Sequence, residues 1–354
     1  MVQSGNLMQE TGMTKLIPWL IAGLVLPLAA AGKIDPVKDR LPDRFDSLGP
    51  TVHQLVMENG RKVHYIDDGE PGWLPVVFTG GLGTSVRIVR LLDFLRTMRQ
   101  DLRIRFITVE RNGFGQTDFD PDLAMADFVR EVEAVLDHLD VKKFAVFGIS
   151  GGGPYTAKIA SMNADRLLSV HMAATSPMLG GGDRCSDESL ASSYRSILQY
   201  PMQYFGFPES SPVHQLEGFQ DSAFDEASRA HFVRGQKADL APLDHEISLY
   251  CDEGWIDNTG VTAPVYVYHG MEDPVMEGTD PETWREAFPE SPVMIRTYAG
   301  EGHDVQYRHL DQILLDMAGY GDRVLVCRDG SEELVRADAA AGLPAGLCLW
   351  SGSH

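Results

Sequence analysis

Short apolar runs alternate with longer amphipathic stretches along most of this chain, and this alternation limits the folds that it can adopt. The short runs are rich in β-branched and aromatic residues, as strands are; they cover 62–66, 76–79, 104–110, 144–148, 169–173, 265–269 and 293–298. The longer stretches carry apolar residues at helical spacing; they cover 86–98, 125–139, 153–162, 281–288 and 305–317. A strand–helix–strand series places helices on both faces of a mostly parallel sheet. The sequence therefore predicts an α/β fold.

The alternation stops between 177 and 262, where Gly, Ser, Pro, Met and aromatic residues replace it. This segment is too long for a structureless loop inside a compact domain, so we predict a helical cap or lid inserted into the core. The predicted core comprises 51–176 and 263–320, preceded by a linker at 32–50.

A C-terminal extension is predicted at 321–354. Within it, the apolar stretches Arg323–Val326 and Glu333–Val335 flank a turn sequence that contains Asp329-Gly330. Asp-Gly between two such stretches indicates a β-hairpin. The sequence suggests no function for this extension.

The N-terminal segment resembles an export signal. Residues 16–31 form an uncharged apolar run that follows a basic residue and is shorter than the ~20 residues of a membrane-spanning helix. Ala29 and Ala31 match the small residues that precede a cleavage site. We therefore expect residues 1–31 to be a signal peptide, with Met13 as the natural initiator. The mature protein is then exported to the periplasm or secreted, without an integral membrane span; a membrane-anchored or cytoplasmic protein is the alternative.

The cysteines bear on the same question. Cys185 and Cys251 lie in the middle of the chain, and Cys327 and Cys348 lie near its end. Two local disulfides would suit an oxidising compartment, although the sequence alone leaves the pairing open and also allows free thiols. The chain has no CxxC motif or His/Cys cluster, so a structural zinc site is not expected.

The charge balance excludes some classes of partner. The chain has 51 acidic and 30 basic residues, which gives a net charge of −21. Such a surface repels phosphate backbones and anionic membranes, so nucleic-acid binding is disfavoured. We interpret the acidity as a solvated surface that maintains solubility. Oligomeric state is not indicated by the sequence.

The most specific motif is a G-x-S-x-G sequence at the end of a predicted strand. Gly148-Ile149-Ser150-Gly151-Gly152 lies between the strand and a predicted helix. A sharp strand-to-helix turn needs glycines because its backbone is strained and neighbouring chains approach closely, and it exposes the serine hydroxyl. Ser150 is therefore the predicted nucleophile.

A serine hydroxyl needs a base to take its proton and an acid to orient that base. Asp273 follows the predicted strand at 265–269, and His303 follows the one at 293–298. The chain order serine, acid, histidine is one that this type of site uses. Asp273 is predicted as the acid and His303 as the base. Three further acidic residues are near enough in sequence to compete for the acid role: Glu272, Glu301 and Asp304.

The loop after the strand at 76–79 is rich in glycine, with the sequence Gly-Gly-Leu-Gly-Thr-Ser. Backbone N–H groups stabilise the oxyanion that forms during acyl transfer. We assign this role to the N–H groups of Leu82 and Gly151. Gly81 and Ile149 beside them, and Met178 at the start of the insertion, are predicted to contact the substrate.

These motifs together resemble those of the α/β-hydrolase superfamily over about residues 55–320. The glycine-rich loop is similar to the family's oxyanion strip, with Gly80 in place of the usual histidine. Residues 110–117 (ERNGFGQT) are similar to the family's Asp-x-x-Gly-x-Gly-x-Ser turn, which we interpret as the floor below the site. The resemblance implies the α/β-hydrolase fold: a mostly parallel central sheet flanked by helices, with an inserted cap. Ser150 rather than aspartate disfavours the epoxide-hydrolase and haloalkane-dehalogenase branches.

The function predicted from these residues is hydrolysis of a small, apolar ester through an acyl-enzyme, with no cofactor and no metal ion. C–C bond hydrolysis, amide hydrolysis and cofactor-free haloperoxidase chemistry remain open on the same residues, because a fold does not determine a reaction. A hypothesis of another class is a non-catalytic binding protein on a hydrolase scaffold. Such proteins usually lose a catalytic residue, whereas Ser150, Asp273 and His303 are all present.

Overall fold

The computed structural model describes residues 49–178, 212–223 and 240–352, which belong to one compact unit. The predicted signal peptide at 1–31, nearly all of the predicted linker and much of the predicted cap lie outside the described residues. No helix within the described ranges is long and apolar enough to cross a bilayer.

The centre of the molecule is a sheet of eight strands. The strands are β1 (Val52–Val56), β2 (Lys62–Asp68), β3 (Leu74–Thr79), β4 (Ile104–Val109), β5 (Phe144–Ile149), β6 (Leu167–Ala173), β7 (Val265–Gly270) and β8 (Val293–Tyr298). Their order across the sheet is β1-β2-β4-β3-β5-β6-β7-β8. β2 is antiparallel to both of its neighbours, and every other adjacent pair is parallel. The mostly parallel sheet predicted from the alternation is confirmed.

The helices and the hairpin surround this sheet. The α-helices are α1 (Arg96–Asp101), α2 (Met125–His138), α3 (Gly152–Met162), α7 (Ala241–Glu253), α8 (Thr283–Ala287), α9 (Val305–Arg308) and α10 (Leu310–Met317). The 3-10 helices are η1 (Val86–Leu95), η2 (Ala164–Arg166), η4 (Pro212–Gln215), η5 (Ala337–Ala339) and η6 (Cys348–Gly352). The helix predicted at 86–98 is thus a 3-10 helix followed by a short α-helix.

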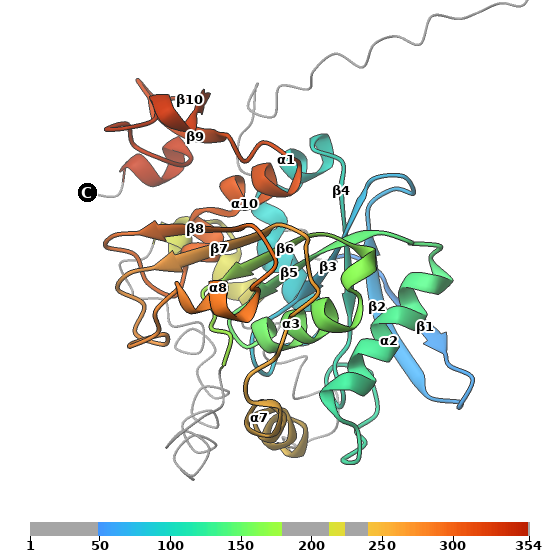
Figure 1. Cartoon of the computed structure of the whole chain (residues 1–354). Helices are drawn as coiled ribbons and strands as arrows, with labels where there is room; N and C mark the ends of the chain where they lie inside the picture. The colour runs from blue at the N-terminus through green and yellow to red at the C-terminus, as the bar shows by residue number, and fades with distance from the viewer. Residues whose placement is uncertain (1–48, 179–211, 224–239, 353–354) are drawn as a thin grey trace, which may run out of the picture. The chain divides into compact units, whose positions relative to one another are not determined.

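Two apolar clusters cover the two faces of the sheet. One cluster joins the sheet to α2, α3, α7 and α8, and includes Val129, Tyr155 and Trp284. The other joins it to η1, α9 and α10, and includes Phe94 and Leu314. Figure 1 shows α2, α3 and α8 on one side of the sheet and α1 and α10 on the other. The central strands β4 and β5 are entirely buried, and β5 accordingly has a continuous apolar sequence.

β1 is the strand that the sequence analysis did not anticipate. It is an edge strand with one neighbour, and most of its side chains are at least partly exposed. An edge strand that buries little surface does not need an apolar run, so it leaves a weak signal in the sequence.

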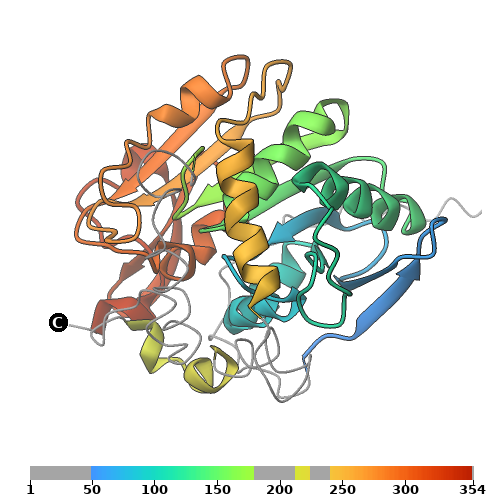
Figure 2. The same cartoon turned by 90° about the horizontal axis from the view of Figure 1, so that it is seen from below.

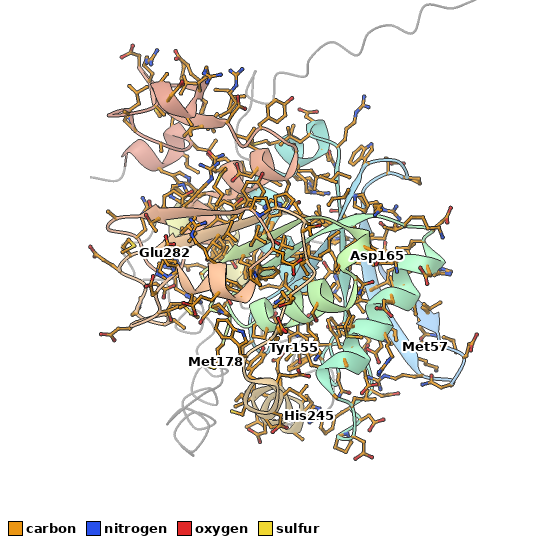
Figure 3. The ribbon with its side chains drawn as sticks, in the orientation of Figure 1. Met57, Tyr155, Asp165, Met178, His245 and Glu282 are labelled. Carbon is orange, nitrogen blue, oxygen red and sulfur yellow. A yellow bond between two sulfur atoms is a disulfide. The ribbon has the colours of Figure 1, made fainter. Side chains whose placement is uncertain are left out.

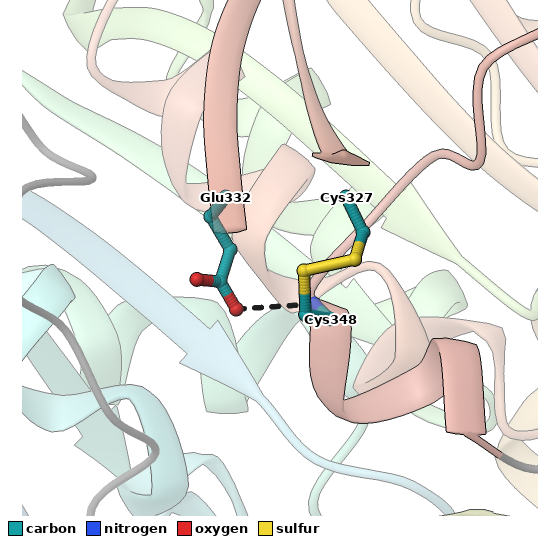
Figure 4. Close-up of a disulfide and its surroundings, with 3 residues drawn as sticks. All are labelled: Cys327, Glu332 and Cys348. Carbon is teal, nitrogen blue, oxygen red and sulfur yellow. Dashed lines mark hydrogen bonds between the residues drawn. A yellow bond between two sulfur atoms is a disulfide. The ribbon is translucent and has the colours of Figure 1, made fainter. Parts of the chain in front are cut away.

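The C-terminal extension forms the predicted hairpin from β9 (Arg323–Arg328) and β10 (Ser331–Arg336). Its turn residues Asp329 and Gly330 have φ values of 52° and 77°, as expected for a tight two-residue turn. A disulfide joins Cys327 to Cys348, and the Cys348 N–H donates to Glu332 Oε1 at 3.1 Å (Figure 4). The extension is thereby closed on itself covalently.

The remaining cysteine pair is described in part. Cys251, in α7, is disulfide-bonded, whereas Cys185 lies outside the described residues. The described part of the predicted cap contains η4 and α7, both of them helical. The division into core, cap and extension stays a prediction.

Candidate active site

The predicted site residues follow strands whose carboxyl ends meet at one edge of the sheet. β3, β5, β6, β7 and β8 are parallel neighbours, and the registers pair Thr79 with Gly148 and Gly270 with Tyr298. The loops after β3, β5, β7 and β8 therefore start side by side. This edge is where ligands bind in open α/β sheets.

Ser150 occupies the turn between β5 and α3. Its φ of 49° lies in the left-handed region, which costs a non-glycine residue on the order of 1 kcal/mol. The surrounding backbone holds this conformation: Ser150 N–H donates to Ala173 O at 3.1 Å, and Ser150 O accepts from Thr175 Oγ1 at 2.7 Å. The strand–turn–helix context predicted for an exposed nucleophile is present.

The glycines of the motif are required by close approach of other chains. A Cβ on Gly148 would lie 2.3 Å from Thr156 Oγ1, and one on Gly152 would lie 2.2 Å from Thr79 O. Neither position can hold a side chain without moving a neighbour, so the sequence signal at this turn has a direct steric cause.

A continuous chain of hydrogen bonds joins Ser150, His303 and Asp273. His303 Nε2 lies 2.9 Å from Ser150 Oγ, and His303 Nδ1 lies 2.8 Å from Asp273 Oδ2. The carboxylate can only accept, so Nδ1 donates and Nε2 is left to accept the serine proton. His303 and Asp273 are buried, whereas Ser150 is partly exposed.

The Asp273 carboxyl is fixed on its other side by backbone groups. Asp273 Oδ1 accepts from the N–H groups of Val275 at 2.8 Å and Met276 at 3.1 Å. Burial by itself would raise the pKa of Asp273, but the hydrogen bond and charge of His303, together with these two N–H groups, hold the pKa below its ordinary value. Asp273 therefore stays ionised beside the imidazole.

Other acidic residues in these loops have different surroundings. Glu301 Oε2 contacts His309 Nε2 at 2.8 Å, and Glu272 is exposed. Asp304 is the N-cap residue of α9, and its carbonyl accepts from Tyr307 N–H. Of the candidates for the acid role, the one hydrogen-bonded to His303 is Asp273.

The glycine-rich loop lies against the serine turn. A Cβ on Gly81 would lie 3.9 Å from Ser150 Oγ, and one on Gly151 would lie 2.5 Å from Leu82 N. Leu82 and Gly151 are both buried. Neither of their N–H groups donates to another backbone group in the described loops and turns. Buried N–H groups without a partner are rare, and among the described residues these two lie next to each other at the serine turn.

Ile149 and Met178 were also predicted to contact the substrate. Ile149 is buried in the apolar cluster that contains η1, and Met178 is exposed at the end of a described range. Figure 3 labels Met178 at this end. Their contact with a substrate stays a prediction.

Arg111 and Glu246 are site residues that the sequence analysis missed. Arg111 Nε lies 2.9 Å from Glu246 Oε1, and both side chains are buried. Burial raises the pKa of the Glu246 carboxyl, while Arg111 and the N–H of Gly83 favour its ionised form. Arg111 lies in the turn that we interpreted as structural. Its charge was the sequence signal that could have marked it as a site residue. Glu246 lies in the insertion, where no local pattern marks it.

The arrangement is suited to nucleophilic catalysis. It combines a serine hydroxyl, a base within hydrogen-bonding distance, an oriented acid and two N–H groups. In the part of the chain that the structure describes, no group of three or more His, Cys, Asp or Glu residues is arranged to hold a metal ion.

Solved structures of low sequence identity share the fold. An alpha/beta hydrolase fold protein from Chitinophaga pinensis superposes with a TM-score of 0.60 and 16% identity, covering 79% of this chain and 99% of its own. A carboxylesterase structure from Nitrososphaera gargenis gives a TM-score of 0.57 and 17% identity, covering 75% and 99%. The enol-lactonase from Burkholderia xenovorans LB400 gives a TM-score of 0.54 and 17% identity, covering 76% of this chain and 99% of its own.

The sequence matches a protein family but no curated protein. Residues 75–310 match the family described as alpha/beta hydrolase fold, which confirms the resemblance seen in the motifs. Because this match covers most of the chain and includes every residue of the Ser150–His303–Asp273 hydrogen-bond chain, the protein belongs to the alpha/beta hydrolase fold family.

Proposed function

We propose that this protein is a serine hydrolase that cleaves a small, apolar carboxylic ester through an acyl-enzyme intermediate. The observation that carries the proposal is the hydrogen-bond chain from Ser150 through His303 to Asp273. The roles of nucleophile, base and orienting acid follow from these contacts and from ordinary acid–base chemistry.

In the first half of the reaction, Ser150 Oγ attacks the carbonyl carbon of the ester, and His303 Nε2 takes the hydroxyl proton. Ionised Asp273 stabilises the imidazolium that results. The N–H groups of Leu82 and Gly151 donate to the oxyanion. When the tetrahedral intermediate collapses, the C–O bond to the alcohol breaks, and His303 returns the proton to the leaving oxygen.

In the second half, water replaces the alcohol. His303 takes a proton from water, whose oxygen attacks the acyl carbon in the same oxyanion hole. Collapse of the second intermediate releases the carboxylic acid, and the proton returns to Ser150 Oγ. Apart from the ester and water, both halves of the reaction use the side chains and N–H groups named above.

Several features favour an ester of low charge. The structural neighbours named above include carboxylesterases and an enol-lactonase, whose names describe cleavage of an acyl–oxygen bond. The net charge of −21 gives the protein little attraction for anionic substrates. Met178 and the aromatic residues in the sequence of the predicted cap are of the kinds that line apolar ligand pockets.

We further propose that the enzyme acts outside the reducing cytoplasm. The disulfide between Cys327 and Cys348 and the disulfide-bonded state of Cys251 support an oxidising compartment. The apolar run at 16–31 supports export by a signal peptide. Mass spectrometry of the mature chain from its native host tests this, and a chain that retains residues 16–31 would contradict cleavage.

The nucleophile is tested with a fluorophosphonate probe. Wild-type protein is expected to be labelled at Ser150 and to hydrolyse p-nitrophenyl esters, with a preference that a series of acyl chain lengths will reveal. Ser150→Ala should abolish both, because it removes the hydroxyl oxygen that attacks the ester and the probe. Folded wild-type protein that shows no Ser150-dependent labelling would reject the proposal.

A further inference from the structure

Helix α7, which belongs to the predicted cap, contacts both sides of the proposed oxyanion hole. Glu246 Oε2 accepts from Gly83 N–H at 2.7 Å, directly after Leu82. Tyr250 Oη donates to Gly151 O at 2.6 Å. Glu246 and Tyr250 are four residues apart, so they share one face of the helix. Figures 1 and 2 show α7 outside the layer of α3, on the side away from the sheet.

The Arg111 guanidinium connects Glu246 to the glycine-rich loop. Its Nη1 donates to Gly80 O at 2.8 Å, and its Nη2 donates to Gly81 O and to Thr84 O. Its Nε faces Glu246, so every nitrogen of the guanidinium contacts this loop or the carboxylate. The Arg111 fork therefore holds the loop carbonyls in one arrangement.

Holding a carbonyl also fixes the direction of the next N–H. In a planar trans peptide, the C=O of one residue and the N–H of the next point in opposite directions. The Gly81 C=O is held by Arg111, which directs the Leu82 N–H away from Arg111. The Ser150 C=O is held by Thr175 Oγ1, which fixes the Gly151 N–H in the same way.

We propose that Glu246 and Arg111 are positioning residues that orient the Leu82 N–H for oxyanion binding, so that α7 of the cap organises the oxyanion hole. This inference rests on the proposed function of Ser150. Neither residue touches the reacting atoms. Glu246 keeps Arg111 in place and provides the counter-charge that a buried guanidinium requires.

The glycine-rich loop of this chain is held by side chains from outside the loop and from within it. Gly80 has no side chain with which to brace the loop, and the contacts that brace it come from Arg111 and from Thr84. The Thr84 hydroxyl donates to Gly81 O at 2.7 Å and belongs to the loop itself. The brace from outside the loop is therefore Arg111, together with the Glu246 carboxylate.

The test compares Glu246→Gln and the double variant Arg111→Met/Glu246→Gln with wild type. The double variant leaves no buried charge unpaired, which covers the case in which Glu246→Gln folds poorly. The readouts are kcat and KM for p-nitrophenyl butyrate and the inhibition constant of a trifluoromethyl alkyl ketone. This ketone forms an adduct with the serine that carries an oxyanion. Circular dichroism confirms that each sample is folded.

Asp68→Asn is the matched control. Asp68 pairs with Arg99, another buried arginine, and lies beside Phe106 near the start of β4, away from the edge that carries Ser150. Loss of this ion pair is expected to lower the melting temperature and to leave kcat and the inhibition constant at wild-type values.

We expect both test variants to lower kcat by about 10- to 100-fold and to weaken ketone inhibition by a similar factor, with KM changed by less than about threefold. Folded variants with wild-type kcat and inhibition would overturn the positioning role, even if their melting temperatures fall. If wild-type protein forms no Ser150-dependent adduct, the proposed function fails, and this inference fails with it. The two failures are distinguished by the behaviour of the wild type.

Discussion

At the scale of single residues, the site depends on positions where no side chain fits. Gly151 follows Ser150 and lies so close to the glycine-rich loop that a Cβ would meet Leu82 N at 2.5 Å and Leu82 Cβ at 2.7 Å. Backbone atoms cannot move aside as the end of a flexible side chain can. The short distance between these two residues is also what brings two N–H donors together.

Gly151→Ala is expected to displace the loop and so to separate the two donors. Loss of one oxyanion donor lowers kcat by about 100- to 1000-fold, and we expect a fall in this range. The measurements are kcat for p-nitrophenyl butyrate and thermal unfolding. Gly321→Ala is the control, because its Cβ would have its nearest contact at an ordinary 3.4 Å, from Tyr266 Oη. Equal activities of the two variants would contradict the predicted displacement.

At the scale of elements, a buried polar network joins β6, β7 and α10. Tyr268 Oη donates to Asp316 Oδ2 at 2.8 Å, so the contact from His171 Nδ1 at 3.2 Å must be a donation to Tyr268. Burial lowers the pKa of His171 to about 3, so the imidazole of the folded protein is neutral at neutral pH. With Nδ1 as the donor, the neutral ring leaves Nε2 to accept from Ser169 Oγ at 2.9 Å.

The network predicts a pH dependence of stability. In the unfolded chain His171 binds a proton below pH ~6.5, whereas in the folded protein it does so only near its lowered pKa. The unfolded state therefore binds more protons, and the free energy of unfolding falls as the pH drops below ~6.5. The His171 contribution amounts to about 2 kcal/mol between pH 7 and pH 5.

His171→Gln should reduce this loss, because an amide does not titrate and can still donate to Tyr268 and accept from Ser169. Urea unfolding at pH 7 and pH 5 gives the two free energies for each protein. His53→Gln, at an exposed position, is the control for loss of one histidine. The prediction is wrong if His171→Gln loses as much stability as wild type on acidification.

At the scale of the whole molecule, the C-terminal extension packs into one of the two apolar clusters that cover the sheet. Leu325, Leu347 and Trp350 belong to the apolar cluster that also contains η1 and α10. Trp350 packs edge-on against Phe94 of η1, with ring centroids 6.2 Å apart. The disulfide between Cys327 and Cys348 ties this segment covalently to the hairpin.

Cys327→Ser/Cys348→Ser should lower the free energy of unfolding. The disulfide spans 21 positions, and closing a loop of this length stabilises the folded state by about 3 kcal/mol on the chain-entropy account. Thermal and urea unfolding of the double variant measure the loss. A double variant as stable as wild type would contradict this contribution and would show that packing holds the extension without the disulfide.

Local sequence signals were sufficient for seven of the eight strands of the sheet and for the turn that carries Ser150. The motif around Ser150 is local, because the steric needs of one turn select its glycines. Asp273 and His303 were marked by position, since each follows a strand and parallel strands end at one edge. The edge strand β1 was not predicted, because it buries little surface and so needs no apolar run.

Only the tertiary structure decided which acid bonds to His303 and which distant residues contact the glycine-rich loop. Several acidic residues lie near His303 in sequence, and backbone geometry brings Asp273 to Nδ1. Glu246 contacts Gly83 across 163 positions of sequence. No periodicity or motif encodes such a contact, because it depends on where packing sets α7 against the core. The sequence by itself determined the strands and the nucleophile turn, which local sterics and side-chain patterning specify; the buried ion pair of Arg111 and Glu246 required the folded chain.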